Sequence, residues 1–262
     1  MMKQIVMSGL LFWVWTLPWA VWAVDAPVVE TETHTEITVD QMIQHIQEAG
    51  QRLTSFQADL IYDVNQPEMD SRFVRKGLIA YQRDPNHSFL RVAFYTLQED
   101  DLPEVIRKEI FYFDGVWLTH VSYDAKSITQ RQMTPEDQPA DAFELASQSM
   151  PLVGFTDMDE LTRHFDISRI ELVDSPERLG LLLRVKPDSD YHKEYTQLTF
   201  EIDPEKWLPA KVVAIASGRG GDREIHTIVF DNASLNQPID PELFLIKKPE
   251  GFGQPEIIPL EK

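Results

Sequence analysis

Cysteine is absent from this chain of 262 residues. Without thiols the protein can form no disulfide, no zinc–thiolate site and no thiol nucleophile, and it offers no N-terminal cysteine for lipid attachment. Basic residues are also scarce, because 24 Lys and Arg stand against 43 Asp and Glu, giving a formal net charge of -19. This balance disfavours binding to nucleic acid or to an anionic membrane surface by bulk electrostatics. We expect an acidic, well-solvated protein that is stabilised by its apolar core alone.

Catalytic and metal-binding motifs are missing as well. The seven histidines are scattered, and none forms a metal-ligand spacing such as HExxH. No GxSxG elbow is present. The glycine-rich stretch 218–222 joins two expected strands, which favours a hairpin loop over a phosphate cradle. Pairs of acids such as Asp157 and Asp159 are expected by chance in so acidic a chain. The sequence therefore predicts a protein that is not an enzyme and that holds neither a metal nor a cofactor.

One long apolar run is present, at the N-terminus. Lys3 precedes the apolar run 5–22, which ends at the small residue Ala23. A basic start, an apolar middle and a small-residue site are the three parts of a secretory signal peptide. An uncleaved membrane anchor is the alternative, because the run is nearly long enough to span a bilayer. We expect residues 1–23 to be a cleaved signal peptide, with a second site after Ala26 as an alternative, and the mature protein to be exported.

The mature chain begins with a helix pattern. Residues 24–36 are acidic and lack an apolar period, so we expect a flexible leader there and a single domain over 37–262. Thr38 and Gln41 have the spacing of a capping box. Apolar residues then recur at helical spacing and predict one amphipathic helix. This stripe consists of Met42, Ile46, Ala49 and Leu53.

From Ser55 onward the apolar period changes to two, which is typical of half-buried strands. Six such segments follow at short intervals, and the pair Asp114–Gly115 is a strong hairpin signal. After a middle segment over 134–149 and a second helix capped by Thr156, five more strands are expected. The expected strands are 56–64, 73–82, 89–97, 105–113, 116–123, 127–133, 167–173, 179–186, 195–202, 208–217 and 224–231.

About eleven strands joined by short links predict one antiparallel sheet. A sheet of this length must curl or close, and the helices are the natural cover for its concave side. The strands at 89–97 and 179–185 are apolar on both faces. We therefore expect both faces of the sheet to be covered at these strands. A curled sheet with an apolar inner face is suited to holding an apolar ligand.

Several short stretches occur in a recognisable order. They are Ser55–Ala58 after the helix, Gly77–Arg83 followed by Pro85, Asn86 and Phe89, then Phe113–Gly115, Trp207–Pro209, and the closing stretch 236–244. In this order and spacing the mature chain resembles the LolA family of periplasmic lipoprotein carriers. It departs from the family in three respects: Ala80 stands where the family usually has Trp, the charge is more acidic, and the segment 134–165 is longer. These departures bear on the partner surfaces more than on the fold.

The resemblance implies a fold and a function. The fold is mainly β with helices (α+β), an incomplete, unclosed antiparallel β-barrel of about eleven strands lidded by α-helices. The function is that of a periplasmic carrier, which accepts acylated lipoproteins or lipids from an inner-membrane ATP-driven lipoprotein transporter. The carrier holds the acyl chains in an apolar cavity and takes them towards the outer membrane, where the involvement of a receptor stays open. We expect a monomer.

The resemblance also nominates binding residues. Arg83 corresponds to the family's strand-end arginine, which binds lid carbonyls and keeps the empty cavity closed; an ordinary solvated turn arginine is the alternative. Phe89 is expected at the cavity mouth, and Met42, Ile46 and Leu53 are expected on the lid helix. Two other functions stay open: a regulatory module on the same fold that senses lipids or lipoproteins, and a secreted hydrolase, for which the sequence offers no catalytic group.

Overall fold

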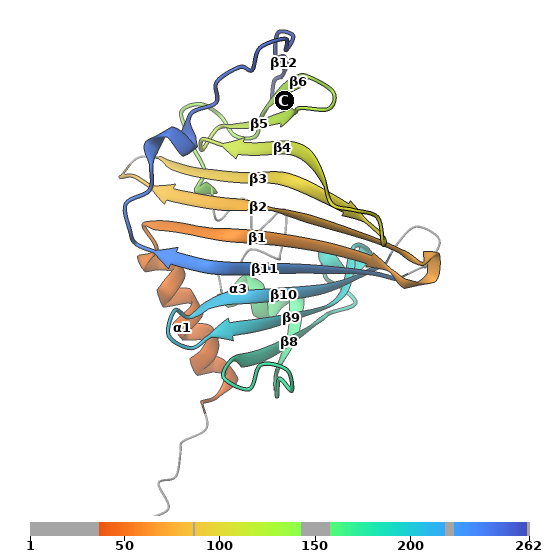
Figure 1. Cartoon of the computed structure of the whole chain (residues 1–262). Helices are drawn as coiled ribbons and strands as arrows, with labels where there is room; N and C mark the ends of the chain where they lie inside the picture. The colour runs from red at the N-terminus through yellow and green to blue at the C-terminus, as the bar shows by residue number, and fades with distance from the viewer. Residues whose placement is uncertain (1–36, 86, 143–157, 218–222, 261–262) are drawn as a thin grey trace, which may run out of the picture. The chain divides into compact units, whose positions relative to one another are not determined.

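One sheet of 12 strands runs through the part of the chain that the computed structural model describes (Figure 1). That part comprises residues 37–85, 87–142, 158–217 and 223–260. The expected signal peptide and leader, within residues 1–36, lie outside it, as does Thr156, the expected cap of the second helix. No helix in the described part is long and apolar enough to cross a membrane.

The strands form two meanders that meet in the middle of the sheet. The order across the sheet is β12-β6-β5-β4-β3-β2-β1-β11-β10-β9-β8-β7, so the pairing of β1 with β11 joins the two halves. The two edge strands, β7 and β12, are not paired with each other, and the sheet is therefore unclosed, as predicted. The bounds are β1 Ser55–Gln66, β2 Ser71–Arg83, β3 Ser88–Glu99, β4 Val105–Phe113, β5 Trp117–Ser122, β6 Ser127–Gln132, β7 Phe165–Ile170, β8 Leu179–Val185, β9 Tyr195–Asp203, β10 Leu208–Ser217, β11 Arg223–Leu235 and β12 Glu256–Ile258.

The count of about eleven strands missed β12. This strand lies in the proline-rich end of the chain and pairs with β6 in parallel, whereas the other pairs are antiparallel. Three residues are too few to display a period of two, and the pairing partner lies more than a hundred residues away. In Figure 1 the segment after β11 passes along the ends of β1 to β3 and then reaches β12. We call residues 236–258 the C-terminal strap.

Within the described part of the chain, two α-helices lie on one side of the sheet, behind it in Figure 1. The first, α1 (Val39–Arg52), begins with the predicted capping box between Thr38 and Gln41 and buries Met42 and Ile43. The second is α3 (Met158–His164). The helix α1 contacts α3, β7 and β10. Three short 3-10 turns complete the described chain: η1 (Pro67–Met69), η2 (Asp190–Lys193) and η3 (Pro241–Phe244).

The sheet has an inner face towards α1 and an outer face towards the strap. Alternate residues of β1, from Phe56 to Leu60, belong to the main core on the inner face, together with Met42 and Ile43 of α1. A second, smaller cluster lies on the outer face of β3 to β6, where Ile246 and Phe252 of the strap pack on it. This cluster consists of Ala93, Ile110, Val121 and Ile128. The strand β3 is therefore covered on both faces, as its sequence predicted.

The structure explains why the stretch Gly77–Arg83 begins with a glycine. A Cβ atom at this position would lie 1.8 Å from the carbonyl oxygen of Ala93, on the neighbouring strand β3. The register of β2 and β3 shifts between Lys76 and Gly77, which marks an irregularity at this point. Only glycine permits so close an approach of two backbones.

Candidate functional site

The inner face beneath α1 is densely apolar. Met42 has no exposed surface, and Leu53, which follows the helix as its C-cap, is 1% exposed. Ile46, also on the predicted stripe, is partly buried against the same core. Its partners in this core come from β1 and from strands on both sides of β1: Phe56, Leu60, Ile79, Phe113, Leu181, Leu198, Val212 and Phe230. The predicted lid stripe therefore faces the sheet.

Arg83 stands at the end of β2, where the sequence predicted a lid tether. Its Nη1 donates to the carbonyl oxygen of Gln51, in the last turn of α1, over 3.3 Å. Its Nε donates to Oδ2 of Asp141 over 3.1 Å, and the hydroxyl of Tyr81 donates to the same carboxylate oxygen over 2.9 Å. Burial, and then the charge of Asp141, raise the pKa of Tyr81, so its hydroxyl stays protonated and keeps donating. We call Arg83, Tyr81, Asp141 and Gln51 the latch.

The chain around Asp141 is fastened to the same strand ends. The backbone amide of Ala142 donates to Oγ of Ser88, the first residue of β3, over 2.6 Å. The amide of Ala140 donates to the carbonyl oxygen of Gly115 in the β4–β5 turn, over 2.9 Å. The latch therefore joins the end of α1, the end of β2 and the segment after β6 at one corner of the inner face.

A second arginine fastens the other end of α1. Nη1 of Arg169, on the edge strand β7, donates to the carbonyl oxygen of Ile37 over 3.2 Å, just before the helix begins. Between the two ends, the ring of His45 stacks on Trp207 with centroids 4.3 Å apart. Nothing in the local sequence marked Arg169 or Asp141, because their partners are carbonyls and side chains that are distant in the chain.

Phe89 does not lie where it was expected. It pairs with Gln82 across β2 and β3, whereas its neighbour Leu90 pairs with the fully buried Tyr81. Because successive residues of a strand point to opposite faces, Phe89 faces away from the inner core. Its ring packs on Phe244 of the strap, with centroids 5.9 Å apart, and stacks on Tyr112. The structure therefore places Phe89 on the outer face, under the strap, instead of at the mouth of an inner cavity.

Beyond the region under α1, the inner face carries polar and charged side chains. Glu109 of β4 accepts from Nη1 of Arg75 over 2.7 Å, and its second oxygen lies 2.8 Å from Nε2 of His120. The Tyr62 hydroxyl lies 2.7 Å from Nδ1 of His226. Burial raises the pKa of Tyr62 to about 12 and lowers the pKa of His226. The described inner face thus has an apolar half under α1 and a polar half beyond it.

These polar residues form no metal centre. The part of the chain that the structure describes contains no group of three or more His, Asp or Glu residues that could hold a metal ion. The Arg75–Glu109–His120 contacts are a salt-bridge network with partly exposed members.

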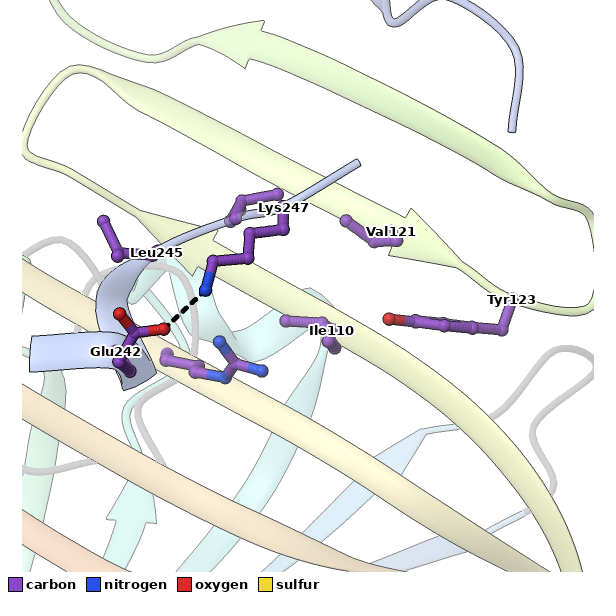
Figure 2. A pocket seen from close by; sticks show the side chains of 8 residues that line it. Ile110, Val121, Tyr123, Glu242, Leu245 and Lys247 are labelled. Carbon is purple, nitrogen blue, oxygen red and sulfur yellow. Dashed lines mark hydrogen bonds and ion pairs between the residues drawn. The ribbon is translucent and has the colours of Figure 1, made fainter. Parts of the chain in front are cut away.

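A pocket of about 160 Å³ lies on the outer face, between the strap and strands β3 to β5 (Figure 2). Ile110 and Val121 form its apolar floor, and the strap contributes Glu242, Leu245, Ile246 and Lys247. Arg91 and Tyr123 complete its lining. No local sequence pattern marked this pocket, because half of its lining comes from the proline-rich end of the chain.

This chain is similar to several solved structures at low sequence identity. No family model and no curated protein matches the sequence. Among solved structures, a conserved protein from Thermus thermophilus matches with 8% identity over 84% of this chain and 98% of that chain, at a TM-score of 0.46. MucB in the Pseudomonas aeruginosa MucA/MucB complex matches with 16% identity over 78% of this chain, at a TM-score of 0.38. This chain spans 59% of that MucB chain, less than two thirds of its length.

A LolA superfamily protein is also among the structural neighbours. It comes from Nitrosomonas europaea and matches with 12% identity over 80% of this chain and 98% of that chain, at a TM-score of 0.31.

Proposed function

We propose that this protein is an exported carrier that binds the acyl chains of lipoproteins or lipids on the inner face of its sheet, in the space that α1 covers. One observation carries the proposal. An amphipathic helix covers an apolar face of an unclosed sheet, and arginine-to-carbonyl hydrogen bonds fasten both its ends. A helix that shares no backbone pairing with the sheet can move away and leave the sheet intact.

The energies of lid and cargo are comparable, which is what a reversible carrier requires. Burying the side chains of Met42, Ile43 and Leu53 contributes about 1.5–3 kcal/mol each, so about 5–9 kcal/mol holds the lid by apolar contact. One acyl chain of about sixteen carbons would gain roughly 12 kcal/mol at about 0.8 kcal/mol per methylene. A single chain can therefore replace the helix against the sheet. Displacing the helix offsets much of the gain, so the cargo stays releasable.

The latch favours the closed position of α1 when no acyl chain is bound. The side chain of Arg83 is 33% exposed, so water can satisfy its donors once the helix leaves. Its bond to the Gln51 carbonyl therefore adds about 1 kcal/mol to the closed state after solvent screening. The closed form is favoured without cargo, and the open form becomes accessible when acyl chains compete for the apolar half.

The carrier proposal includes steps outside the protein. We propose that a membrane-bound, ATP-driven transporter loads the acyl chains and that the protein carries them across the periplasm. The acidic charge of -19 suits a carrier that must not adhere to anionic membrane surfaces between loading and delivery. Export itself rests on the N-terminal sequence pattern and is tested by N-terminal sequencing of the periplasmic protein, which should begin at Val24 or Pro27.

Binding and latch can be tested together. An apolar fluorophore should bind saturably to the native protein and be displaced by palmitate. Arg83→Leu should keep the fold, bind acyl ligands at least as tightly as the native protein, and fail to pass them on to acceptor vesicles. Arg72→Leu is the matched control, because Arg72 also stands at an end of β2 and pairs with a single acid, Asp63.

Two results would count against the carrier. Absence of any saturable site would refute acyl binding as a whole. Equal binding and delivery by the native protein and by the Arg83→Leu and Arg72→Leu variants would reduce Arg83 to a surface arginine and leave the latch without a function.

A further inference from the structure

The outer-face pocket beneath the strap is separate from the proposed acyl site. Ile110 and Val121 are 6% and 2% exposed and belong to the outer-face cluster, which shares no residue with the main core. Figure 2 shows the Tyr123 ring extending over the floor, with its hydroxyl directed towards Ile110. The ion pair of Glu242 with Lys247 lies on the opposite side of the same hollow, with its atoms 2.6 Å apart (Figure 2).

Arg91, which lines the pocket, has a buried hydrogen-bond donor without a partner among the described residues. Arg91 donates from Nη1 to the carbonyl oxygen of Leu243 over 2.6 Å, but its buried Nε has no hydrogen-bond partner in the part of the chain that the structure describes. A buried guanidinium donor without a partner carries a desolvation cost that an acceptor in the pocket would remove. Such a donor is a reason to look for a ligand oxygen at this place.

The local charge also favours an anion. The pocket holds two cations, Arg91 and Lys247, and one anion, Glu242. A third cation, Lys108, stands over the face of the Tyr123 ring, with its Nζ 4.5 Å from the centroid. In a chain with a net charge of -19, this is a place where positive side chains gather around an apolar floor.

We propose that this pocket binds a small aliphatic carboxylate, with the carboxylate at Arg91 and the aliphatic body on Ile110 and Val121. A volume of about 160 Å³ corresponds to roughly five water molecules at about 30 Å³ each, which admits a carboxylate with a compact body of about four to six carbons. Two sources share this chemistry: a free branched short-chain acid, and the C-terminal residue of a peptide that ends in an aliphatic side chain.

Titration calorimetry on the full chain tests the proposal with four probes. They are 4-methylpentanoate, 4-methylpentan-1-ol, the dipeptide N-acetyl-alanyl-leucine and its C-terminal amide. Each acid should bind at least about tenfold more tightly than its uncharged partner, the range that a charge-assisted hydrogen bond provides. The free acid and the dipeptide distinguish the two sources, because the source that the site serves should bind the tighter of the two.

Substitutions that remove a cation and one that removes the anion of the pocket should change the affinity in opposite directions. Arg91→Gln should weaken binding of the better acid about tenfold or more, and Lys247→Gln should weaken it severalfold. Glu242→Gln should strengthen it severalfold, because it removes the one anion of the pocket. Arg107→Gln is the control and should change nothing, because Arg107 is 50% exposed and pairs with Glu99 and Asp124.

Each outcome decides for or against the site. Because Arg91→Gln also removes the bond to Leu243, the stability of this variant is checked by thermal melts. If it unfolds, the variants at the exposed positions Lys247 and Glu242 still test the site. Equal binding of the acids and their uncharged partners, no binding of any probe at 10 mM (about 3 kcal/mol of affinity), or no effect of Lys247→Gln and Glu242→Gln would overturn the proposal. The result is independent of palmitate binding on the inner face.

Discussion

The helix α1 and the C-terminal strap cover opposite faces of one sheet, and they are fastened in different ways. The helix rests on side chains: Met42 and Ile43 are buried beneath it, and arginines bind its ends. The strap adds a strand, because β12 pairs with β6 through the backbone. A cover held by side chains can be exchanged for a ligand of similar apolarity, whereas a cover that extends the sheet is part of the fold. Under the carrier proposal, the inner face is therefore the face that opens.

The largest expected effect is on the helix. Met42→Ala removes a fully buried side chain and should cost about 2–5 kcal/mol. If α1 is an exchangeable cover, the loss should appear mainly as faster hydrogen exchange of amides in α1, with β6 and β12 little changed. Met69→Ala, at a position that is 53% exposed, is the matched control and should leave exchange unchanged. Uniform loss of protection over the whole sheet would mean that α1 is ordinary core.

Phe252→Ala makes the corresponding test on the strap. Its ring packs edge-on against Tyr123, with centroids 5.3 Å apart, and it is partly buried, so we expect a loss of about 1–3 kcal/mol. Exchange should rise at β12 and β6, and binding of palmitate should stay within twofold of the native protein. Tyr95→Ala, an exposed aromatic on the same strand β3 that the cluster uses, serves as the control. A clear loss of palmitate binding in Phe252→Ala would show that the two covers are coupled.

The two arginine tethers are expected to have smaller effects. Arg83→Leu and Arg169→Leu should each favour the open helix by about 1 kcal/mol, because each removes a partly screened charge-assisted bond to a carbonyl. The two bonds lie at opposite ends of α1, so their effects on palmitate affinity should add in the double variant. Fluorescence competition on the four proteins measures this. A double variant no different from either single variant would show that one of the two contacts does not hold the helix.

The smallest expected effect is the pH dependence that His226 contributes. Burial lowers its pKa, so the unfolded chain binds a proton more readily than the folded one as the pH falls below about 6.5. Its neutral form is fully compatible with the fold above that pH, and the free energy of unfolding falls from there down to the folded pKa. Thermal melts at pH 7.5 and 5.5 should show a smaller decrease for His226→Gln than for the native protein. An identical decrease in both proteins would contradict this role.

Much of the fold could be predicted from the spacing of apolar residues and other local sequence signals. The capping box at Thr38 and the alternation from Phe56 to Val64 are local signals, and the structure confirms both elements close to their predicted bounds. Asp114–Gly115 turned the chain as expected, with Gly115 at a φ of 96°. Such features depend on neighbours in sequence, and a single sequence displays them.

The contacts of the candidate site could be predicted less well from the sequence. Arg83 was predicted from a family resemblance, but its partner Asp141 lies 58 residues further on, in a segment without a clear pattern. Phe89 was misplaced because the resemblance suggested an inner cavity mouth, whereas the pairing of Phe89 with Gln82 fixes its face. The face of a strand residue depends on register, and a shift of one residue reverses it. The strap and its pocket depend on long-range pairing, which the sequence of a proline-rich tail does not specify.

The most direct test of the carrier is to map where an acyl chain binds. The full chain would be incubated with palmitate that carries a diazirine near its methyl end, irradiated, digested and sequenced by mass spectrometry, with unlabelled palmitate as competitor. We expect competed labels on inner-face residues beneath α1, such as Ile79 and Phe230. Labels confined to Ile110 and Val121 on the outer face, or labelling that unlabelled palmitate does not reduce, would contradict acyl binding under the helix.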